Sequence, residues 1–303
     1  MQRLTFDRTR WGTSQCGETA NDSFKGGIMN NRRRPYRGRL QAVILDWAGT
    51  TVDHGSLAPV RVLEQIFADR GIEISEQEAR RDMGVLKKDH IRSLLHSERI
   101  AGEWKRRFHQ APGEDEVENL FADFIPQQMA CLVECSNVIS GVPRAVERLR
   151  HRGLKIGSTT GYTRPLMEIL LPHAARQGYV ADCVLCPDDV GAGRPLPWMI
   201  YENAVRMKVY PLEAVIKIGD TISDIEEGLN AGCWAVGVAQ TGNMIGISEQ
   251  RWDALSPAER EVRLRDARRK LQEAGAHFTI DTLADINPIV DGIEARLQSG
   301  ERP

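Results

Sequence analysis

Cysteine is scarce in this sequence: the 303 residues contain only six, too few for the disulfide framework of a small secreted protein. No stretch reaches the run of about 18 apolar residues that indicates a membrane-spanning helix. Neither sign of charge is in excess, because 40 basic residues stand against 42 acidic ones, for a net charge of −2. These absences argue against a secreted disulfide-rich module, a membrane protein, and a protein whose main partner is nucleic acid or a membrane surface. We expect a cytoplasmic protein with reduced thiols.

The rest of the composition is that of an ordinary globular protein of about two domains. Hydrophobic residues make up 41% and charged residues 27% of the chain, with 27 Gly and 14 Pro, which excludes collagen-like and wholly disordered sequences. Residues 1–39 differ from the rest, because eight arginines and Lys25 face three acidic residues there. We expect this basic stretch to be a disordered N-terminal extension, with Met29 as an alternative initiator.

Short apolar runs alternate with helical patterns from residue 41 onward. The first run, 41–46, is apolar up to Asp46, as in a parallel strand that is buried on both faces. Similar runs follow at 154–158, 183–186, 214–220, 233–238 and 277–280. Strands that alternate with helices form βαβ units, so we expect an α/β fold. Its core would be a Rossmann-like domain with a parallel sheet, which binds ligands at the carboxyl ends of the strands.

A long helical segment separates the first two runs. Its helical patterns lie at 60–70, 75–97, 100–110 and 114–135. A connection of this length far exceeds an ordinary crossover. Ser75 and Glu78 have the spacing of a capping box, which marks a helix start. We therefore expect an inserted helical cap domain at 56–138, and an α/β core domain made of 40–55 and 139–303.

Polar residues follow several of the predicted strands. Asp46 ends the first, and Asp220 ends the fourth, with Asp224 one helical turn later. Carboxylates that meet at strand ends suit a hard cation such as Mg²⁺. The hydroxyl and backbone donors at 158–162 and the cation of Arg194 suit phosphoryl oxygens. The sequence thus predicts a site for a metal ion and a phosphoryl group.

These strand-end residues resemble the four motifs of the haloacid dehalogenase superfamily of phosphotransferases, with the helical insertion matching its cap domain. In chain order they are Asp46, Thr160, Arg194 and the pair of Asp220 and Asp224. Most phosphatases of that superfamily carry a second Asp two residues after the nucleophile, as the acid that protonates a leaving alkoxide. This chain has Ala48 there. A reaction whose leaving group is carbon could do without that acid.

A second resemblance lies in the predicted cap. Lys87 and His90 stand three residues apart on one helical face, and an amine beside an imidazole can form an imine. Here the chain is similar to the phosphonatase family, the phosphonoacetaldehyde hydrolases, over about residues 40–298. The matching motifs are residues 46–53, 83–90, 158–164, 192–198 and 219–228. The resemblance implies an enzyme, a hydrolase acting on carbon–phosphorus bonds.

The resemblance also implies a reaction and a role for each motif residue. The aldehyde of phosphonoacetaldehyde condenses with Lys87 to a protonated imine, and Asp46 attacks phosphorus to give an aspartyl-phosphate that water hydrolyses. His90 would move protons. The implied cofactor is Mg²⁺, held by Asp46, the Ala48 carbonyl and Asp220, with Asp224 orienting it from behind. The implied substrate-binding residues are Thr160, Gly161, Tyr162, Arg194, Met83 and Gly84.

Two other classes of function stay open on the sequence. One is a phosphomonoesterase or phosphomutase of the same superfamily, against which Ala48 argues. The other is a non-catalytic binding protein on this fold, which would bind phosphate or Mg²⁺ tightly without turnover. For partners, we expect a small-molecule phosphonate substrate, and neither nucleic acid nor membrane.

Similar proteins pair through their caps. In this chain Val60, Leu63, Ile66 and Phe67 form an apolar face on the first predicted cap helix. We expect these residues to form the two-fold seam of a homodimer. The resemblance further implies a role in the degradation of 2-aminoethylphosphonate.

Overall fold

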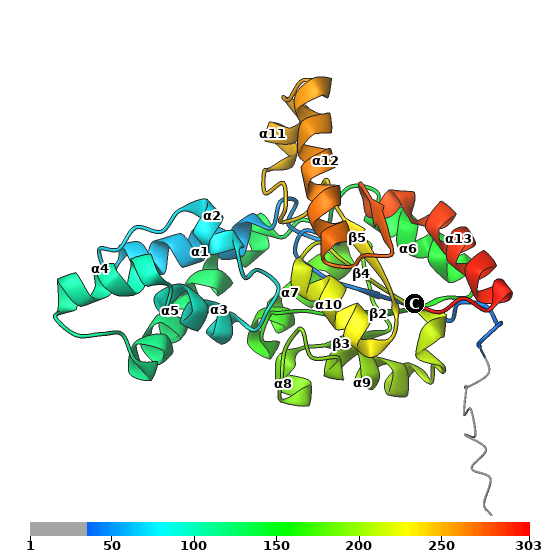
Figure 1. The fold of residues 1–303 in the computed structure, drawn as a ribbon, viewed down its shortest axis with the longest axis horizontal. Coiled ribbons are helices and arrows are strands. Elements are labelled where there is room, and N and C mark those ends of the chain that lie inside the picture. The colour runs from blue at the N-terminus through cyan, green and yellow to red at the C-terminus, as the bar shows by residue number, and fades with distance from the viewer. Residues whose placement is uncertain (1–34) are drawn as a thin grey trace, which may run out of the picture. The chain divides into compact units, whose positions relative to one another are not determined.

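The computed structural model describes residues 35–303 (Figure 1). Residues 1–34, which hold most of the predicted basic extension, lie outside the described part. Arg37 precedes the first strand and donates a hydrogen bond at 3.2 Å to the backbone carbonyl of Gln298. The segment before the sheet is thereby held against α13 (Ile286–Ser299).

Six parallel strands form one sheet in the order β3-β2-β1-β4-β5-β6. They are β1 (Ala42–Leu45), β2 (Lys155–Thr159), β3 (Cys183–Leu185), β4 (Val215–Gly219), β5 (Trp234–Val238) and β6 (Phe278–Ile280). The ends of each strand lie within one residue of a predicted run, so the predicted α/β fold is confirmed. The strand order reverses between β1 and β4, and ligands bind at such a switch point in open parallel sheets.

Helices cover both faces of the sheet, as βαβ connections require. They are α6 (Val142–His151), α7 (Arg164–Arg176), α8 (Pro187–Val190), α9 (Trp198–Met207), α10 (Ile222–Ala231), α11 (Glu249–Asp253) and α12 (Pro257–Glu273), with 3-10 turns at Leu212–Ala214 and Leu283–Asp285. Val43 and Leu45 of β1 join a hydrophobic cluster with α6 and α13, whereas Ile44 packs with α9. Successive residues of β1 therefore face opposite layers, which explains a run that is apolar throughout.

The first five of the six helices between β1 and β2 form the cap, and Figure 1 shows them grouped at one side of the sheet. They are α1 (Leu57–Ala68), α2 (Glu76–Arg80), α3 (Lys87–Leu95), α4 (Glu98–Phe108) and α5 (Glu114–Cys135). Helices α1 and α3 pack against α5 around a hydrophobic cluster that includes Leu63, Phe67 and Phe124. The cap thus has a hydrophobic core of its own.

The helix predicted over 75–97 is wrong in its middle. The chain forms α2 and α3, joined by a turn at 81–86 in which Gly84 has a φ of +94°. This left-handed backbone conformation favours glycine and ends the helical pattern. The predicted capping box is confirmed, because Ser75 Oγ accepts a hydrogen bond from the Glu78 N–H and the Glu78 carboxylate accepts one from the Ser75 N–H.

The face of α1 predicted to pair two copies is buried inside the chain. Val60, Leu63, Ile66 and Phe67 are at most 4% exposed and belong to the hydrophobic cluster of the cap. Their spacing does indicate an apolar face, but α5 of the same chain packs on α1. The predicted seam is therefore wrong for these four residues.

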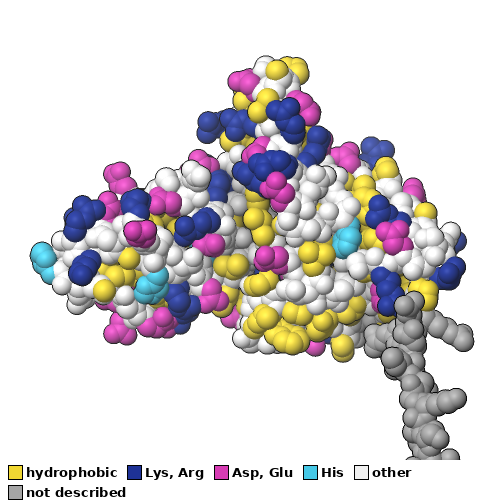
Figure 2. All heavy atoms as spheres, viewed as in Figure 1, with side chains coloured by type: hydrophobic (Ala, Val, Ile, Leu, Met, Phe, Trp, Pro, Cys, Tyr) yellow, Lys and Arg dark blue, Asp and Glu magenta, His cyan; other side chains and the backbone are white. Residues whose placement is uncertain are grey.

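Figure 2 shows Lys and Arg side chains interspersed with Asp and Glu over the cap. Hydrophobic side chains gather instead over the α8 and α9 region in the same view. Exposed apolar residues of that region include Leu196, Trp198 and Val205. Among the described helices, none combines the length and the apolar character needed to cross a membrane.

Candidate active site

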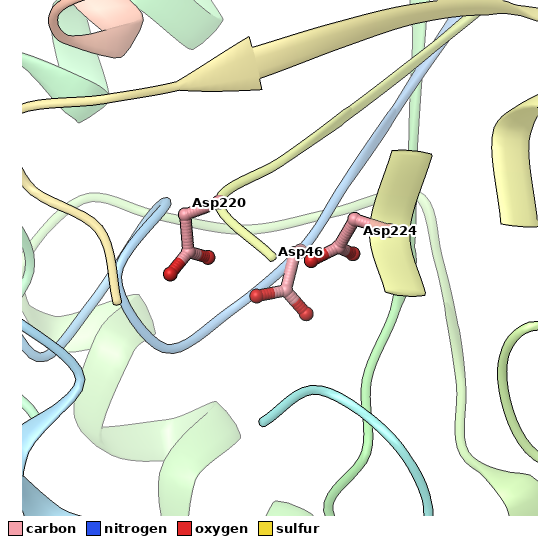
Figure 3. A group of neighbouring side chains, drawn as sticks. All are labelled: Asp46, Asp220 and Asp224. Atoms are coloured by element: carbon pink, nitrogen blue, oxygen red, sulfur yellow. The ribbon is translucent and has the colours of Figure 1, made fainter. Parts of the chain in front are cut away.

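The polar residues predicted at the strand ends converge where the strand order reverses. Asp46 follows β1, Thr160 follows β2 and Asp220 follows β4. Because β1 pairs with both β2 and β4, the sheet itself places these ends next to one another. Figure 3 shows the carboxylates of Asp46, Asp220 and Asp224 close together, with Asp224 carried by the first turn of α10.

A pocket lies here between the core and the cap. Its lining comes from both: Asp46, Ala48, Ser56, Pro59, Met83, Gly84, Lys87, Thr160, Gly161, Tyr162, Arg194 and Thr221. The predictions miss Ser56, Pro59 and Thr221. Thr221 lies inside the 219–228 motif and could have been inferred from it, whereas Ser56 and Pro59, at the start of α1, carry no such signal. The predicted residues His90, Asp220 and Asp224 lie outside the lining.

The three buried aspartates form a group that could hold a metal ion. One carboxylate oxygen from each lies within 4.8 Å of the other two. Asp220 is oriented by the Thr50 hydroxyl, which donates at 2.9 Å, and by the Asn243 N–H, which donates at 2.7 Å. Burial, together with the charges of Asp46 and Asp224, raises the pKa of Asp220 well above its usual range. A divalent cation relieves such crowded negative charge, so this donor set fits one.

The guanidinium of Arg194 binds the predicted nucleophile directly. Its Nη2 lies 2.6 Å from Asp46 Oδ1 and donates to the Thr159 carbonyl at 2.8 Å. Its Nη1 and Nε form ion pairs with Asp224 at 2.9 Å and with Glu227 at 3.0 Å. Burial alone would lower the pKa of Arg194, but the carboxylates outweigh burial and keep the guanidinium charged. A fixed cation beside Asp46 can receive an anionic oxygen.

A second buried cation, Lys217, is absent from the predicted site. Its Nζ lies 2.8 Å from Asp224 Oδ1 and 3.1 Å from Glu227 Oε2. The sequence does contain a signal for it, because Lys217 interrupts the apolar run that forms the fully buried β4. A charged residue in such a strand requires buried partners of opposite charge.

The Lys87 side chain reaches the pocket from the first turn of α3 and is only 2% exposed. Its Nζ lies 3.5 Å from Met83 Sδ and 6.0 Å from the centre of the Tyr162 ring. Burial lowers the pKa of Lys87 to about 8, so roughly a tenth of the amine is uncharged at pH 7. The neighbouring Lys88 instead pairs with Glu118 of α5. Of these two lysines, only Lys87 presents an amine to the pocket.

His90 lies one turn beyond Lys87 on α3 and is fully buried. Burial, with the charge of Lys87 adding to it, lowers the pKa of His90 well below its usual range. The imidazole is therefore neutral. The same burial opposes protonation of the ring, so it is the place of His90 one turn from Lys87 that favours a role in proton transfer.

The turn at 81–86 makes close contact with the core. A Cβ at Gly84 would come within 2.4 Å of the hydroxyl oxygens of Thr221 and Ser223. Gly161 faces the same turn, and a Cβ there would lie 2.7 Å from the Val85 carbonyl oxygen. Two glycines thus permit the direct contact of cap and core at the pocket.

Known proteins resemble this chain in sequence and in structure. A family model described as haloacid dehalogenase-like hydrolase matches residues 40–232. The phosphonoacetaldehyde hydrolase of Syntrophobacter fumaroxidans is 44% identical over 272 residues, which cover 90% of this chain and 98% of that one. That of Bacillus anthracis is 47% identical over 256 residues, covering 84% and 97%. The crystal structure of a phosphonoacetaldehyde hydrolase like protein from Oleispira antarctica is 38% identical, with a TM-score of 0.88 and coverage of 91% of this chain and 100% of its own.

Proposed function

Since this chain belongs to the haloacid dehalogenase-like hydrolases, and among them to the phosphonoacetaldehyde hydrolases, we propose that it hydrolyses the carbon–phosphorus bond of phosphonoacetaldehyde to acetaldehyde and phosphate. The observation that carries this proposal is Lys87, a buried amine of lowered pKa in the same pocket as Asp46. A phosphate monoester needs an acid for its leaving group, and Ala48 occupies that place. An aldehyde substrate instead requires a neutral amine.

The reaction begins at Lys87. Its uncharged amine adds to the aldehyde carbon, and loss of water gives a protonated imine between Nζ and that carbon. The imine withdraws electrons from the neighbouring carbon, which carries the phosphonyl group. The carbon–phosphorus bond can then break with its electron pair passing into an enamine rather than onto a bare carbanion. Burial of Lys87 supports this step because it favours the uncharged amine.

Asp46 acts as the nucleophile in this cleavage. One of its carboxylate oxygens attacks phosphorus as the carbon–phosphorus bond breaks, which forms an aspartyl-phosphate. Water then attacks this phosphorus, and the bond to Asp46 breaks to release phosphate. The enamine takes up a proton at carbon, and water hydrolyses the resulting imine to acetaldehyde and free Lys87. The position of Asp46 at the end of β1, inside the pocket, supports this role.

The phosphoryl oxygens are received by Arg194, Thr160 and Gly161. The Thr160 hydroxyl oxygen accepts a hydrogen bond from the Tyr162 N–H at 3.1 Å, which leaves its own hydrogen to be donated. The guanidinium of Arg194 is already fixed beside Asp46. Charge stabilisation of this kind is the main source of rate in phosphoryl transfer.

Bound Mg²⁺ supplies positive charge opposite the developing charge on the phosphoryl oxygens. Asp46, the Ala48 carbonyl and Asp220 would hold the ion, and the clustered carboxylate oxygens support this assignment. Asp224 would orient the bound ion indirectly rather than bind it. Its ion pair with Arg194 at 2.9 Å supports that indirect role, because this carboxylate is already engaged.

The remaining predicted residues move protons and shape the pocket. His90 is the proposed proton shuttle, and its position one turn from Lys87 on α3 supports this. Met83 and Gly84 form the cap side of the pocket. Tyr162 lines the boundary between the domains, with its ring facing the amine of Lys87.

Acetaldehyde release from phosphonoacetaldehyde tests the proposal, followed through coupled alcohol dehydrogenase with Mg²⁺ present. Lys87→Arg and Asp46→Asn should each lower turnover by at least about a thousandfold. Lys88→Arg is the matched control and should keep nearly full activity, because Lys88 pairs with Glu118 away from the pocket. A folded, Mg²⁺-loaded wild type without turnover would refute the proposed function.

We also propose that the enzyme is a cytoplasmic homodimer that acts in the degradation of 2-aminoethylphosphonate. The buried face of α1 cannot form the dimer contact. Met129 and Val133, which are exposed on α5, are apolar cap residues that remain available for it. Light scattering tests whether the protein is a dimer, and a monomeric mass at working concentration would rule the dimer out.

A further inference from the structure

The cap residue Arg80, at the end of α2, is hydrogen-bonded to the core. Its Nη1 donates to the Asn243 side-chain oxygen at 3.0 Å and to the Gly55 carbonyl at 2.9 Å. Its Nη2 donates to the Gly246 carbonyl at 2.8 Å. Asn243 and Gly246 belong to the loop after β5, and Gly55 belongs to the link between β1 and α1. The Arg80 side chain is 12% exposed, so these bonds are largely shielded from water.

Asn243 also donates a hydrogen bond to Arg80, and it connects Arg80 to the group of three aspartates. Its side-chain Nδ2 donates to the Arg80 backbone carbonyl at 3.1 Å, so each side chain binds the other residue. Its backbone N–H donates to Asp220 Oδ2 at 2.7 Å. A continuous series of hydrogen bonds therefore runs from Asp220 through Asn243 to Arg80.

The core loop is shaped to receive this guanidinium. Gly246 has a φ of +68°, which favours glycine, and a Cβ there would lie only 2.6 Å from Arg80 Cζ. The same loop contacts the link to the cap, because His54 Nδ1 lies 3.0 Å from the Ile247 carbonyl oxygen. The planar guanidinium presents five donors on three nitrogens in a fixed geometry, whereas a lysine presents three donors on one nitrogen.

The turn that carries the cap's pocket residues begins directly after Arg80. Residues 81–86 form this turn, and Lys87 then opens α3. Fixing Arg80 on the core therefore fixes one end of the turn. A misplacement of about 1 Å at a reacting group can cost a hundredfold in rate, so the position of this end affects how Lys87 meets its substrate.

We propose that Arg80 and Asn243 are positioning residues that hold the turn at 81–86 against the core and so align Lys87 with Asp46. The inference rests on the proposed function, because it assigns the contact a purpose in that reaction. Among the described residues of the cap helices, the only ion-pair partner of the Arg80 side chain is Glu76, which lies on the same helix. Arg80 is also not part of the hydrophobic cluster of the cap, so removing the guanidinium should leave that cluster intact.

The test compares Arg80→Met and Asn243→Ala with Arg99→Met as the matched control. Arg99 is also bonded several times, but to residues inside the cap such as Glu78 and Glu103. We expect Arg80→Met to lower kcat for phosphonoacetaldehyde about 10- to 100-fold with a smaller change in KM, because alignment rather than binding is lost. Asn243→Ala should do the same to a lesser degree. Arg99→Met should stay within about threefold of wild type.

Amide hydrogen exchange gives a readout that does not need turnover. Arg80→Met and Asn243→Ala should raise exchange at residues 83–91 and leave α5 unchanged. Orthovanadate binding to the Mg²⁺-loaded variants should stay within about threefold of wild type, because the phosphoryl site of the core is intact. If wild type failed to act on phosphonoacetaldehyde, the proposed function would fall, and the exchange data would still decide whether Arg80 holds the turn.

Unchanged kcat and unchanged exchange at 83–91 in both variants would overturn the inference. Loss of kcat accompanied by an equal loss of orthovanadate binding would overturn it too, because the core rather than the turn would then be disturbed. If Arg80→Met does not fold, Asn243→Ala is compared with wild type instead. That variant keeps the hydrogen bond from the backbone N–H of residue 243 to Asp220. Arg80→Lys keeps the charge without the planar guanidinium and should recover only part of kcat.

Discussion

Arg194 and Lys217 share the same three oxygen atoms. Thr159 Oγ1, Asp224 Oδ1 and Glu227 Oε2 each lie within 3.1 Å of a nitrogen of both cations. All five residues are buried. Asp46, 2.6 Å from Arg194 Nη2, adds a third carboxylate, so two buried cations neutralise most of the charge of three buried carboxylates where water cannot screen them. Arg194 also lines the pocket.

Lys217→Met should remove one of the two cations of this group. Three buried carboxylates, Asp46, Asp224 and Glu227, would then share the single cation of Arg194, and we expect a loss of about 3 to 5 kcal/mol in the free energy of unfolding. Adding Glu227→Gln removes one of these negative charges and should restore at least half of that loss. Urea unfolding of the single and double variants measures both effects.

Arg206→Met is the surface control for this prediction. Arg206 pairs with Glu202 at 2.7 Å, but both side chains are more than a third exposed, so its loss should cost less than about 1 kcal/mol. Equal losses in the buried and surface variants would contradict the charge balance described for Lys217. A double variant less stable than Lys217→Met would contradict it as well.

Gly84→Ala should separate the cap from the core without unfolding either. The added methyl group would meet the hydroxyl oxygens of Thr221 and Ser223, and the φ of +94° disfavours any Cβ, so we expect kcat/KM to fall about a hundredfold. Gly102→Ala, on α4 with no atom within 4 Å of its Cβ, is the control. It should keep full activity and gain roughly 0.5 to 1 kcal/mol of stability. Full activity in Gly84→Ala would show that this contact does not matter.

The rate of imine formation should rise with pH, reach half of its plateau near pH 8 and level off above it. The uncharged amine is the nucleophile, and burial lowers the pKa of Lys87 to about 8. Below that value the rate should change about tenfold per pH unit. Borohydride trapping after short reaction times measures it across the pH range. A midpoint near 10.5, the ordinary value for lysine, would show that burial does not tune this amine.

Lys87→Met should make the folded protein more stable at neutral pH. The pKa of Lys87 is about 8 in the folded chain, against 10.5 ordinarily. At every pH below about 8, burying the charged amine therefore lowers the free energy of unfolding. That cost is at most about 3 kcal/mol, and it shrinks as the pH rises from 8 to 10.5. Unfolding at pH 7 and pH 10 should show a larger gain at pH 7. Lys88→Met, on the surface, should show none, and a gain that grows with pH would contradict a lowered pKa for Lys87.

Ala48→Asp should give the protein a weak phosphomonoesterase activity. The new carboxyl group would stand where an acid can protonate a leaving alkoxide, on a residue that already lines the pocket. Phosphate release from glycerol phosphate measures the gain. Adding Asp46→Asn must abolish it, because the nucleophile is shared. Ester hydrolysis at the same rate in wild type would show that the acid is not what is missing.

The sheet and the core half of the candidate site could be predicted because they depend on local pattern. The strands are short and largely apolar, although Lys217 interrupts β4, and the carboxyl ends of parallel strands lie at one edge of the sheet. Asp46 and Asp220 each end such a strand, so both were expected at that edge, whereas the pairing of β1 with β4 that brings them together is seen in the structure. The capping box of Ser75 and Glu78 is local in the same sense.

Contacts between distant segments could not be predicted in this way. Arg80 and Asn243 are 163 positions apart, and in the sequence each resembles an ordinary polar surface residue. The break at Gly84 depends on how the turn meets the core, which helical spacing does not show. The apolar face of α1, which includes Val60, has the same pattern whether α5 of the same chain or a second copy covers it.

Borohydride reduction of the protein with phosphonoacetaldehyde, followed by mass spectrometry of its peptides, tests the central claim most directly. Reduction converts an imine into a stable secondary amine and so marks the lysine that formed it. We expect modification of Lys87, no modification of Lys88, and no trapped adduct in Lys87→Arg. Full turnover by wild type with Lys87 unmodified, or a trapped adduct on another lysine, would contradict the imine route through Lys87.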